Sequence, residues 1–95
     1  MNDLDKIILI NIIKEQLPNA KICLFGSRAR NDNKPKSDID LAIDIGQKIE
    51  SQTMSKIKEN IEECIIPFTV DIVDINNVQN DFKIQILKDC MVWKI

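Results

Sequence analysis

Two aspartates separated by a single residue are the strongest chemical signal in this sequence. Asp38 and Asp40 lie in a segment whose alternating residues predict a strand. Successive side chains of a strand point to opposite faces, so both carboxylates project from the same face, with Cα atoms roughly 6.6 Å apart. Carboxylate oxygens at this spacing suit one hard cation or a close pair of cations. Without a cation the two charges repel each other.

The same pair also has an ordinary explanation, a solvated strand end in which Asp38 belongs to a turn and Asp40 faces water. The preceding segment makes a functional interpretation stronger. Residues 20–25 predict a short strand that enters Gly26 and Ser27, after which a helix is expected to begin. The unpaired backbone N–H groups and the positive end of such a helix form an anion site.

Three residues of this turn are suited to holding phosphate groups. Gly26 has no Cβ, so a phosphate can approach the backbone closely, and the Ser27 hydroxyl can donate a hydrogen bond to a phosphate oxygen. Arg30 lies three residues after Ser27 and shares its helix face, whereas Arg28 points elsewhere. The sequence therefore predicts a phosphate seat at Gly26, Ser27 and Arg30 beside a cation site, the combination that phosphoryl and nucleotidyl transfer require.

Composition excludes several other chemistries. The 95 residues include no histidine and no tyrosine, which removes His-based acid-base catalysis and imidazole zinc sites. A net charge of −2 argues against tight nucleic-acid binding. Three cysteines without a CxxC pair are expected to be buried free thiols. No apolar run is long enough for a membrane span, and the acidic N-terminus is unlike a signal peptide, so we expect a cytoplasmic protein.

Hydrophobic periodicity predicts a single α/β domain over residues 1–95, with a small mixed β-sheet and helices packed on it. Helices and strands are expected to alternate, beginning and ending with a helix. The predicted elements are a helix over 4–17, a strand over 20–25, a short helix from 27, a strand over 38–45, a helix from Ser51 or Thr53 to Cys64, a strand over 68–75, a helix from Asn76 or Asn77 through Leu87, and a short edge strand at 91–95.

The ordered pattern Gly26-Ser27, Arg30, Asp38 and Asp40 resembles that of the DNA polymerase β-type nucleotidyltransferase superfamily. The resemblance covers essentially the whole chain and is strongest to the minimal stand-alone nucleotidyltransferases. One departure is Asn31, which stands where the family usually has glycine. Asparagine tolerates left-handed backbone geometry better than most residues, so the turn is expected to survive.

The family resemblance implies a third carboxylate on a later strand, and Asp71 is our choice for it. Asp74 is the competitor, but it lies on the opposite strand face and is expected to face solvent or to cap the next element. Asp44 shares the parity of Asp38 and Asp40 but lies about 13 Å beyond Asp40 by strand rise.

The resemblance further implies an activity, its cofactors and a partner. Asp38, Asp40 and Asp71 would bind two Mg²⁺ ions, with Mn²⁺ as a substitute. Gly26 and Ser27 would hold the phosphates of ATP together with Arg30. The expected reaction moves AMP from ATP to a hydroxyl group, on a partner that resembles the small helical toxins of the HEPN class. Two alternatives stay open: a non-catalytic antitoxin that masks its partner, and, with a poorer fit, a phosphorylatable acidic-pocket signalling domain.

A few other side chains have competing interpretations. Lys34 and Lys36 could reach a triphosphate from their loop, although solvated lysines are the simpler expectation. Trp93 and Phe82 could stack on a nucleotide base, but we expect both rings in the core. The first predicted helix is apolar nearly all the way round, so it either lies deep in the domain or presents a face to a partner.

Overall fold

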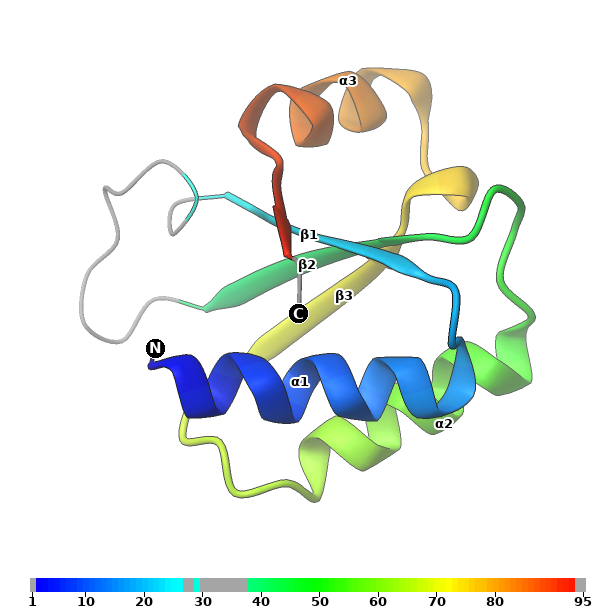
Figure 1. Ribbon diagram of the computed structural model, residues 1–95. Coiled ribbons are helices and arrows are strands. Elements are labelled where there is room, and N and C mark those ends of the chain that lie inside the picture. The colour runs from blue at the N-terminus through cyan, green and yellow to red at the C-terminus, as the bar shows by residue number, and fades with distance from the viewer. Residues whose placement is uncertain (1, 27–28, 30–37, 94–95) are drawn as a thin grey trace.

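A computed structural model describes residues 2–26, 29 and 38–93 of the chain (Figure 1). The predicted small mixed sheet with helices packed on it is confirmed, but the last described element is the strand at the C-terminal end and not a helix. The elements are helix α1 (Asp3–Gln16), strands β1 (Lys21–Phe25) and β2 (Ile39–Asp44), helix α2 (Ser51–Glu62), strand β3 (Val70–Asp74), the 3-10 helix η1 (Ile75–Asn77), helix α3 (Asn80–Asp89) and strand β4 (Met91–Trp93). The predicted short helix from residue 27 lies outside the described residues, apart from Ala29.

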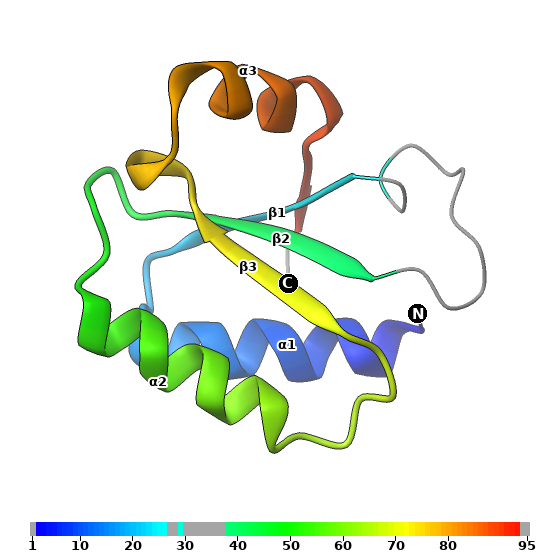
Figure 2. The same cartoon turned by 180° about the vertical axis from the view of Figure 1, so that it is seen from behind.

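The strands form one mixed sheet in the order β3-β2-β1-β4. Strand β1 is antiparallel to both β2 and β4, whereas β2 and β3 run parallel, joined through α2. Helices α1 and α2 cover one face of the sheet and α3 lies over the other face (Figures 1 and 2). The sheet is therefore the middle layer of a three-layer arrangement, and β3 and β4 are its edges.

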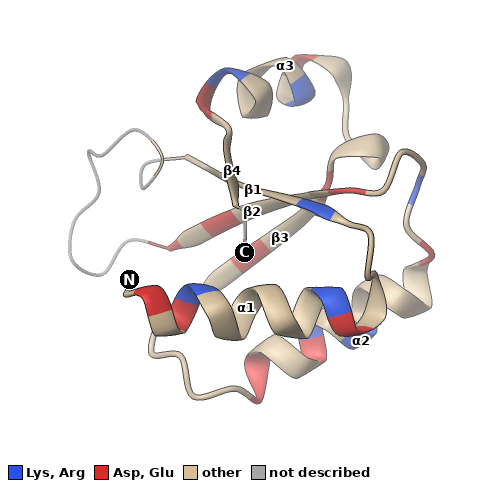
Figure 3. Cartoon of the chain, in the orientation of Figure 1, with Lys and Arg blue, Asp and Glu red and all other residues tan. Residues whose placement is uncertain are grey.

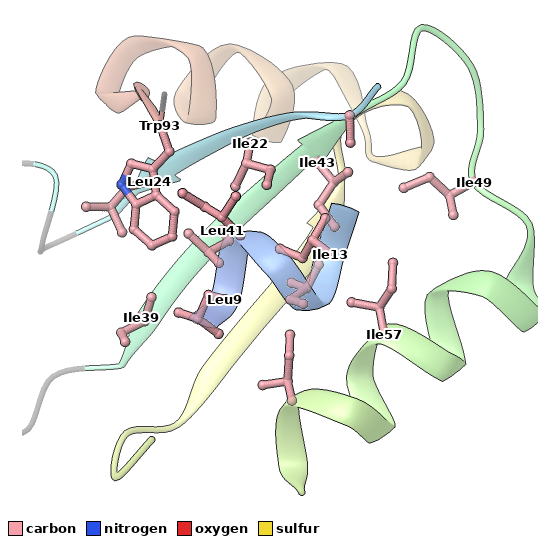
Figure 4. Packing of buried hydrophobic residues seen from close by; sticks show 14 residues of the cluster. Leu9, Ile13, Ile22, Leu24, Ile39, Leu41, Ile43, Ile49, Ile57 and Trp93 are labelled. Carbon is pink, nitrogen blue, oxygen red and sulfur yellow. The ribbon is translucent and has the colours of Figure 1, made fainter. Parts of the chain in front are cut away.

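The larger core lies between the sheet and the two helices α1 and α2 (Figure 4). It is built from alternate strand residues, which the pleat directs to one face, and from one stripe of each helix. Its most deeply buried side chains include Leu9 and Ile13 of α1, Ile57 of α2, and Ile39 and Leu41 of β2. This packing holds the start of β2 firmly in place on the face away from its aspartates.

Helix α1 is mainly a core helix, as its apolar composition allowed. Leu9, Ile10 and Ile13 are buried, but Leu4 and Ile7 near its N-terminus are exposed. The helix begins at Asp3 because the Asn2 side chain accepts a hydrogen bond from the Asp5 backbone N–H at 2.8 Å. None of the described helices is both long enough and apolar enough to cross a membrane.

The smaller core lies between the sheet and α3, and it contains Cys23, Ala42, Ile75 and Ile86. Burial, together with a hydrogen bond to the Cys90 side chain, raises the pKa of Cys23 to about 12. This thiol therefore stays protonated at neutral pH and is not a nucleophile. All three cysteines are free, as predicted, but only Cys23 is fully buried.

Two helix boundaries differ from the sequence-based prediction. Helix α2 is capped by Glu50, without a side-chain hydrogen bond, rather than by Ser51 or Thr53. The expected continuous helix after β3 is divided into η1 and α3, because the chain is extended at Val78 and Gln79. Ile75 of η1 and Ile86 of α3 both pack in the smaller core.

Asp74 corrects part of the sequence-based interpretation. It does cap the next element, since it accepts a hydrogen bond from the Asn76 backbone N–H at 3.0 Å, but it does not face solvent. Its side chain is only 7% exposed and also accepts the Ile49 backbone N–H at 2.7 Å. The carboxylate therefore joins the end of β3 to the segment that leads into α2, far along the strand from Asp71.

Asp44 holds the neighbouring end of β2 in a similar way. Its Oδ1 accepts hydrogen bonds from the Gly46 backbone N–H and the Asn76 side-chain amide, both at 2.8 Å. The pKa of Asp44 lies below its ordinary value. The largest cause is the hydrogen bond from Asn76, and the next is the hydrogen bond from the Gly46 backbone. Asp44 is thus a structural residue, consistent with its distance from Asp40 along the strand.

The lowered pKa of Asp44 predicts a contribution to acid stability. The stabilisation is complete above the unfolded-state pKa, near 3.9, and is lost as the pH falls through the lower folded-state pKa. Asp44→Asn should therefore lower the free energy of unfolding at pH 7 and flatten its dependence on pH below about 4. Urea unfolding at several pH values measures both effects, with Glu59→Gln on the exposed face of α2 as the control. An unchanged acid limb in Asp44→Asn would contradict this assignment.

Candidate active site

The predicted acidic residues lie on the face of the sheet that α3 covers only in part. Side chains alternate along β2, and Ile39 and Leu41 belong to the core beneath α1 and α2. Asp38 and Asp40 therefore project from the opposite face. In β3 the same alternation turns Val70 and Ile72 toward the larger core. The carboxylate-bearing positions of β2 and β3 thus share one face, and Figure 3 shows acidic positions on both strands.

Asp40 and Asp71 are direct register partners across the parallel pair of β2 and β3. Neighbouring strands are about 4.8 Å apart, so the two Cα atoms stand side by side and both side chains leave the sheet in the same direction. Asp40 is half-buried and Asp71 is exposed. The structure therefore brings the predicted third carboxylate next to one of the first two, although 30 residues of chain separate them.

Gly26 ends β1 directly beside Asp40. Its backbone φ is +77°, in the region that favours glycine, and a Cβ on it would lie 2.5 Å from Asp40 Oδ2. The close neighbour of Gly26 is thus a carboxylate of the site. The sequence-based reason for glycine here is that a phosphate must approach the backbone. The structure adds a second reason, since the register of β1 and β2 places the Asp40 carboxylate where a Cβ would lie.

Asp38 differs from the other two carboxylates because it lies outside a strand. It immediately precedes β2 and is exposed. Among residues 2–26, 29 and 38–93, no group of three or more histidine, cysteine, aspartate or glutamate side chains is gathered closely enough to hold a metal ion. The described geometry therefore joins Asp40 with Asp71, and Asp38 would have to turn toward them to complete a three-carboxylate site.

The phosphate-binding side chains of the predicted site cannot be placed in the same way. Ser27 and Arg30, together with Asn31, Lys34 and Lys36, lie outside the described residues, so their roles remain predictions. The Ala29 backbone N–H donates to the Gly26 carbonyl oxygen at 3.1 Å.

An aromatic pair beside the acidic residues was missed in the sequence analysis. The rings of Phe25 and Phe82 meet edge to face with centroids 6.1 Å apart, and Phe25 is the register partner of Asp40. Phe82 is 43% exposed, so the expectation of a buried ring is wrong for it, whereas Trp93 is buried as predicted. Phe25 next to Gly26 was the available signal, but its partner on α3 depends on tertiary packing.

Comparison of the sequence with known proteins assigns the chain to a family. The family model described as "Polymerase beta, Nucleotidyltransferase" matches residues 8–93. A probable protein adenylyltransferase MntA from Haemophilus influenzae is 31% identical over 76 residues, which cover 80% of this chain and 67% of the relative. A putative protein adenylyltransferase, MJ0435 from Methanocaldococcus jannaschii, is 29% identical over 91 residues, covering 96% of this chain and 95% of the relative.

The fold agrees with the sequence comparison. A crystal structure of a toxin-antitoxin with AMP-PNP superposes with a TM-score of 0.78 at 19% identity, covering 96% of this chain and 74% of the other. At this identity the superposition supports the fold alone. The match over residues 8–93 establishes that the chain belongs to the polymerase β nucleotidyltransferase family.

Proposed function

We propose that this chain is a divalent-metal-dependent protein adenylyltransferase, which transfers AMP from ATP to a hydroxyl group of a partner protein. The observation that carries the proposal is the register pairing of Asp40 with Asp71 on one open face of the sheet. Family membership supports nucleotidyl transfer, and the names of the two relatives support a protein as the acceptor.

The donor chemistry of the site fits Mg²⁺ or Mn²⁺. Hard divalent cations prefer carboxylate oxygens, and Asp40 and Asp71 offer them from adjacent positions. Asp38 would join them from its exposed position just before β2. Bound cations at this place would neutralise charge on the triphosphate and activate the attacking hydroxyl. Gly26 leaves the space in which the Asp40 carboxylate lies, which supports a cation site on the β1 side of Asp40.

Each residue of the site then has a role in the transfer. The acceptor hydroxyl oxygen attacks the α-phosphorus of ATP, the bond from that phosphorus to the bridging oxygen breaks, and pyrophosphate leaves. Asp71 is exposed and is the carboxylate that we assign to accept the hydroxyl proton. Asp38 and Asp40 would hold the cations, and Ser27 and Arg30 would bind the β- and γ-phosphates of ATP.

The partner that we propose is a toxin of the small helical HEPN class. The support is the MntA relative together with the superposed structure, which is described as a toxin-antitoxin with AMP-PNP. Masking of the toxin without catalysis is the second candidate function. The observation that favours it is the position of Asp38, because no three acidic side chains of the described residues converge.

Transfer to the partner is tested with the protein, radiolabelled ATP, Mg²⁺ and the product of the neighbouring gene as the candidate toxin. We expect label on the toxin with the native chain and a loss of at least about a hundredfold with Asp71→Asn, since removal of a general base commonly has this effect. Asp81→Asn, an exposed aspartate in the first turn of α3, is the matched control and should keep full activity. Inhibition of the toxin without any label would instead support masking.

Stability measurements test the cation site independently of turnover. Like charges directly opposite each other on neighbouring strands are destabilising, so in metal-free, low-salt buffer Asp71→Asn should raise the free energy of unfolding by about 0.2–1 kcal/mol. Mg²⁺ with a non-hydrolysable ATP analogue should raise the Tm of the native chain and leave that of Asp71→Asn nearly unchanged. An equal rise in both proteins would remove Asp71 from the site.

The two glycines with positive φ provide a matched test of the glycine turn. Both Gly26 (+77°) and Gly46 (+81°) would be strained by a side chain, at a cost of about 1–2 kcal/mol. A Cβ on Gly46 would meet no atom within 4 Å, whereas a Cβ on Gly26 would collide with the Asp40 carboxylate. Gly26→Ala should therefore abolish the nucleotide-induced rise in Tm, and Gly46→Ala should retain it. Equal retention would show that the Asp40 position is unimportant.

A further inference from the structure

The outer edge of β3 has backbone hydrogen-bonding groups without a neighbouring strand. Among the described residues, β3 pairs only with β2. The Ile39 backbone N–H donates to the Thr69 carbonyl oxygen at 2.9 Å, and Ile39 is the register partner of Val70. In a parallel ladder this pattern turns the N–H and C=O groups of Val70, and of Ile72 two residues later, away from β2. These groups face outward, on both sides of Asp71.

A pocket of about 480 Å³ opens beside this edge, between β3 and α2. Figure 2 shows α2 and β3 on the near side of the molecule, joined by the connection that follows α2. The apolar lining consists of side chains that pack on the larger core, and charged groups stand among them. The lining residues are Lys58, Ile61, Glu62, Ile66, Phe68 and residues 69–72 of the β3 strand and its approach.

The chemistry of the pocket argues against a nucleotide as its occupant. Its lining includes one cationic side chain, Lys58, beside the carboxylate of Glu62, since the Asp71 side chain leaves the sheet on the other face, and this set lacks the several cations that bind a triphosphate. Its apolar walls, which include Ile61 and Ile72, suit an uncharged side chain instead. A peptide segment supplies such side chains together with backbone groups that match the open edge.

We propose that the acceptor hydroxyl reaches Asp71 on an extended peptide segment, which binds as an additional strand along the outer edge of β3. The inference rests on the proposed function and names the form of its substrate. Side chains of an added strand alternate between the two sheet faces. A hydroxyl residue opposite Asp71 therefore points to the acidic face, while the residues before and after it point toward the pocket beside α2.

This geometry defines the acceptor sequence. A serine, threonine or tyrosine is flanked on both sides by apolar residues, which occupy the pocket on the same side of the sheet as Val70 and Ile72. An added strand lies about 4.8 Å from β3, so the hydroxyl stands within reach of the Asp71 carboxylate that accepts its proton. The oxygen of this hydroxyl forms the new bond to the α-phosphorus as pyrophosphate departs.

Amide hydrogen exchange tests the docking without relying on catalysis. The probe is the synthetic peptide acetyl-Lys-Thr-Val-Ser-Val-Thr-Lys-amide, added in millimolar excess to the ¹⁵N-labelled full chain. We expect the Val70 and Ile72 amides to exchange at least about tenfold more slowly with the peptide. The Val92 amide on the opposite edge strand is the internal control and should be unaffected. Unchanged exchange at Val70 and Ile72, or protection of Val92 instead, would overturn the inference.

N-methylated peptides give the matched control on the ligand side. N-methylation removes one backbone donor, either at the central serine or at the two valines. An antiparallel added strand directs the valine N–H groups at β3, whereas a parallel one directs the serine N–H at it. One of the two modified peptides should therefore lose the protection of Val70 and Ile72, and the other should keep it. Retention of protection by both peptides would rule out strand addition.

The same experiment separates this inference from the proposed function. If the toxin acquires AMP while no acceptor peptide protects the β3 amides, the acceptor binds elsewhere, and the inference fails while the transferase assignment stands. If the amides are protected but neither toxin nor peptide acquires AMP, the peptide-binding edge stands and the transferase assignment fails. Val70→Pro removes one outward N–H at the first residue of an edge strand, where proline is tolerated, and should weaken peptide protection of Ile72.

Discussion

The parallel pairing of β2 with β3 is the constraint on which the site depends. It places Asp40 directly beside Asp71, an arrangement that repulsion between two carboxylates disfavours. The pairing is held from below, because Ile39, Leu41 and Ile72 on the other face of the same strands are packed into the larger core. Hydrophobic burial on one face therefore offsets charge repulsion on the other, and a bound cation would remove the repulsion.

Polar contacts at the far ends of these strands serve the same arrangement. Asp44 and Asp74 close the carboxyl ends of β2 and β3 through Asn76 and the backbone near Gly46 and Ile49. These two carboxylates accept hydrogen bonds from the protein itself, so they stabilise the fold at the ends of the strands. Aspartates of the same two strands thus divide into one pair at their carboxyl ends, Asp44 and Asp74, and one pair on the face toward α3, Asp40 and Asp71.

The order of elements and the acidic face could be predicted because both follow from local periodicity. Alternation along residues 38–45 was enough to assign Asp38 and Asp40 to one side, and the odd spacing between Asp71 and Asp74 assigned those two residues to opposite faces. Register is different, since it is decided by which strands pair and how far each slides. The contact between Gly26 and Asp40, the ring pair of Phe25 with Phe82, and the burial of Asp74 all depend on register or tertiary packing, so sequence alone did not show them.

The open edge of β3 would also decide how this domain recognises a protein acceptor. Backbone groups at a sheet edge bind an extended segment without added structure and leave specificity to alternate side chains. Since β3 carries both the open edge and Asp71, the strand that orients the acceptor is also the strand that would take its proton. Recognition and chemistry are then aligned by the geometry of a single element.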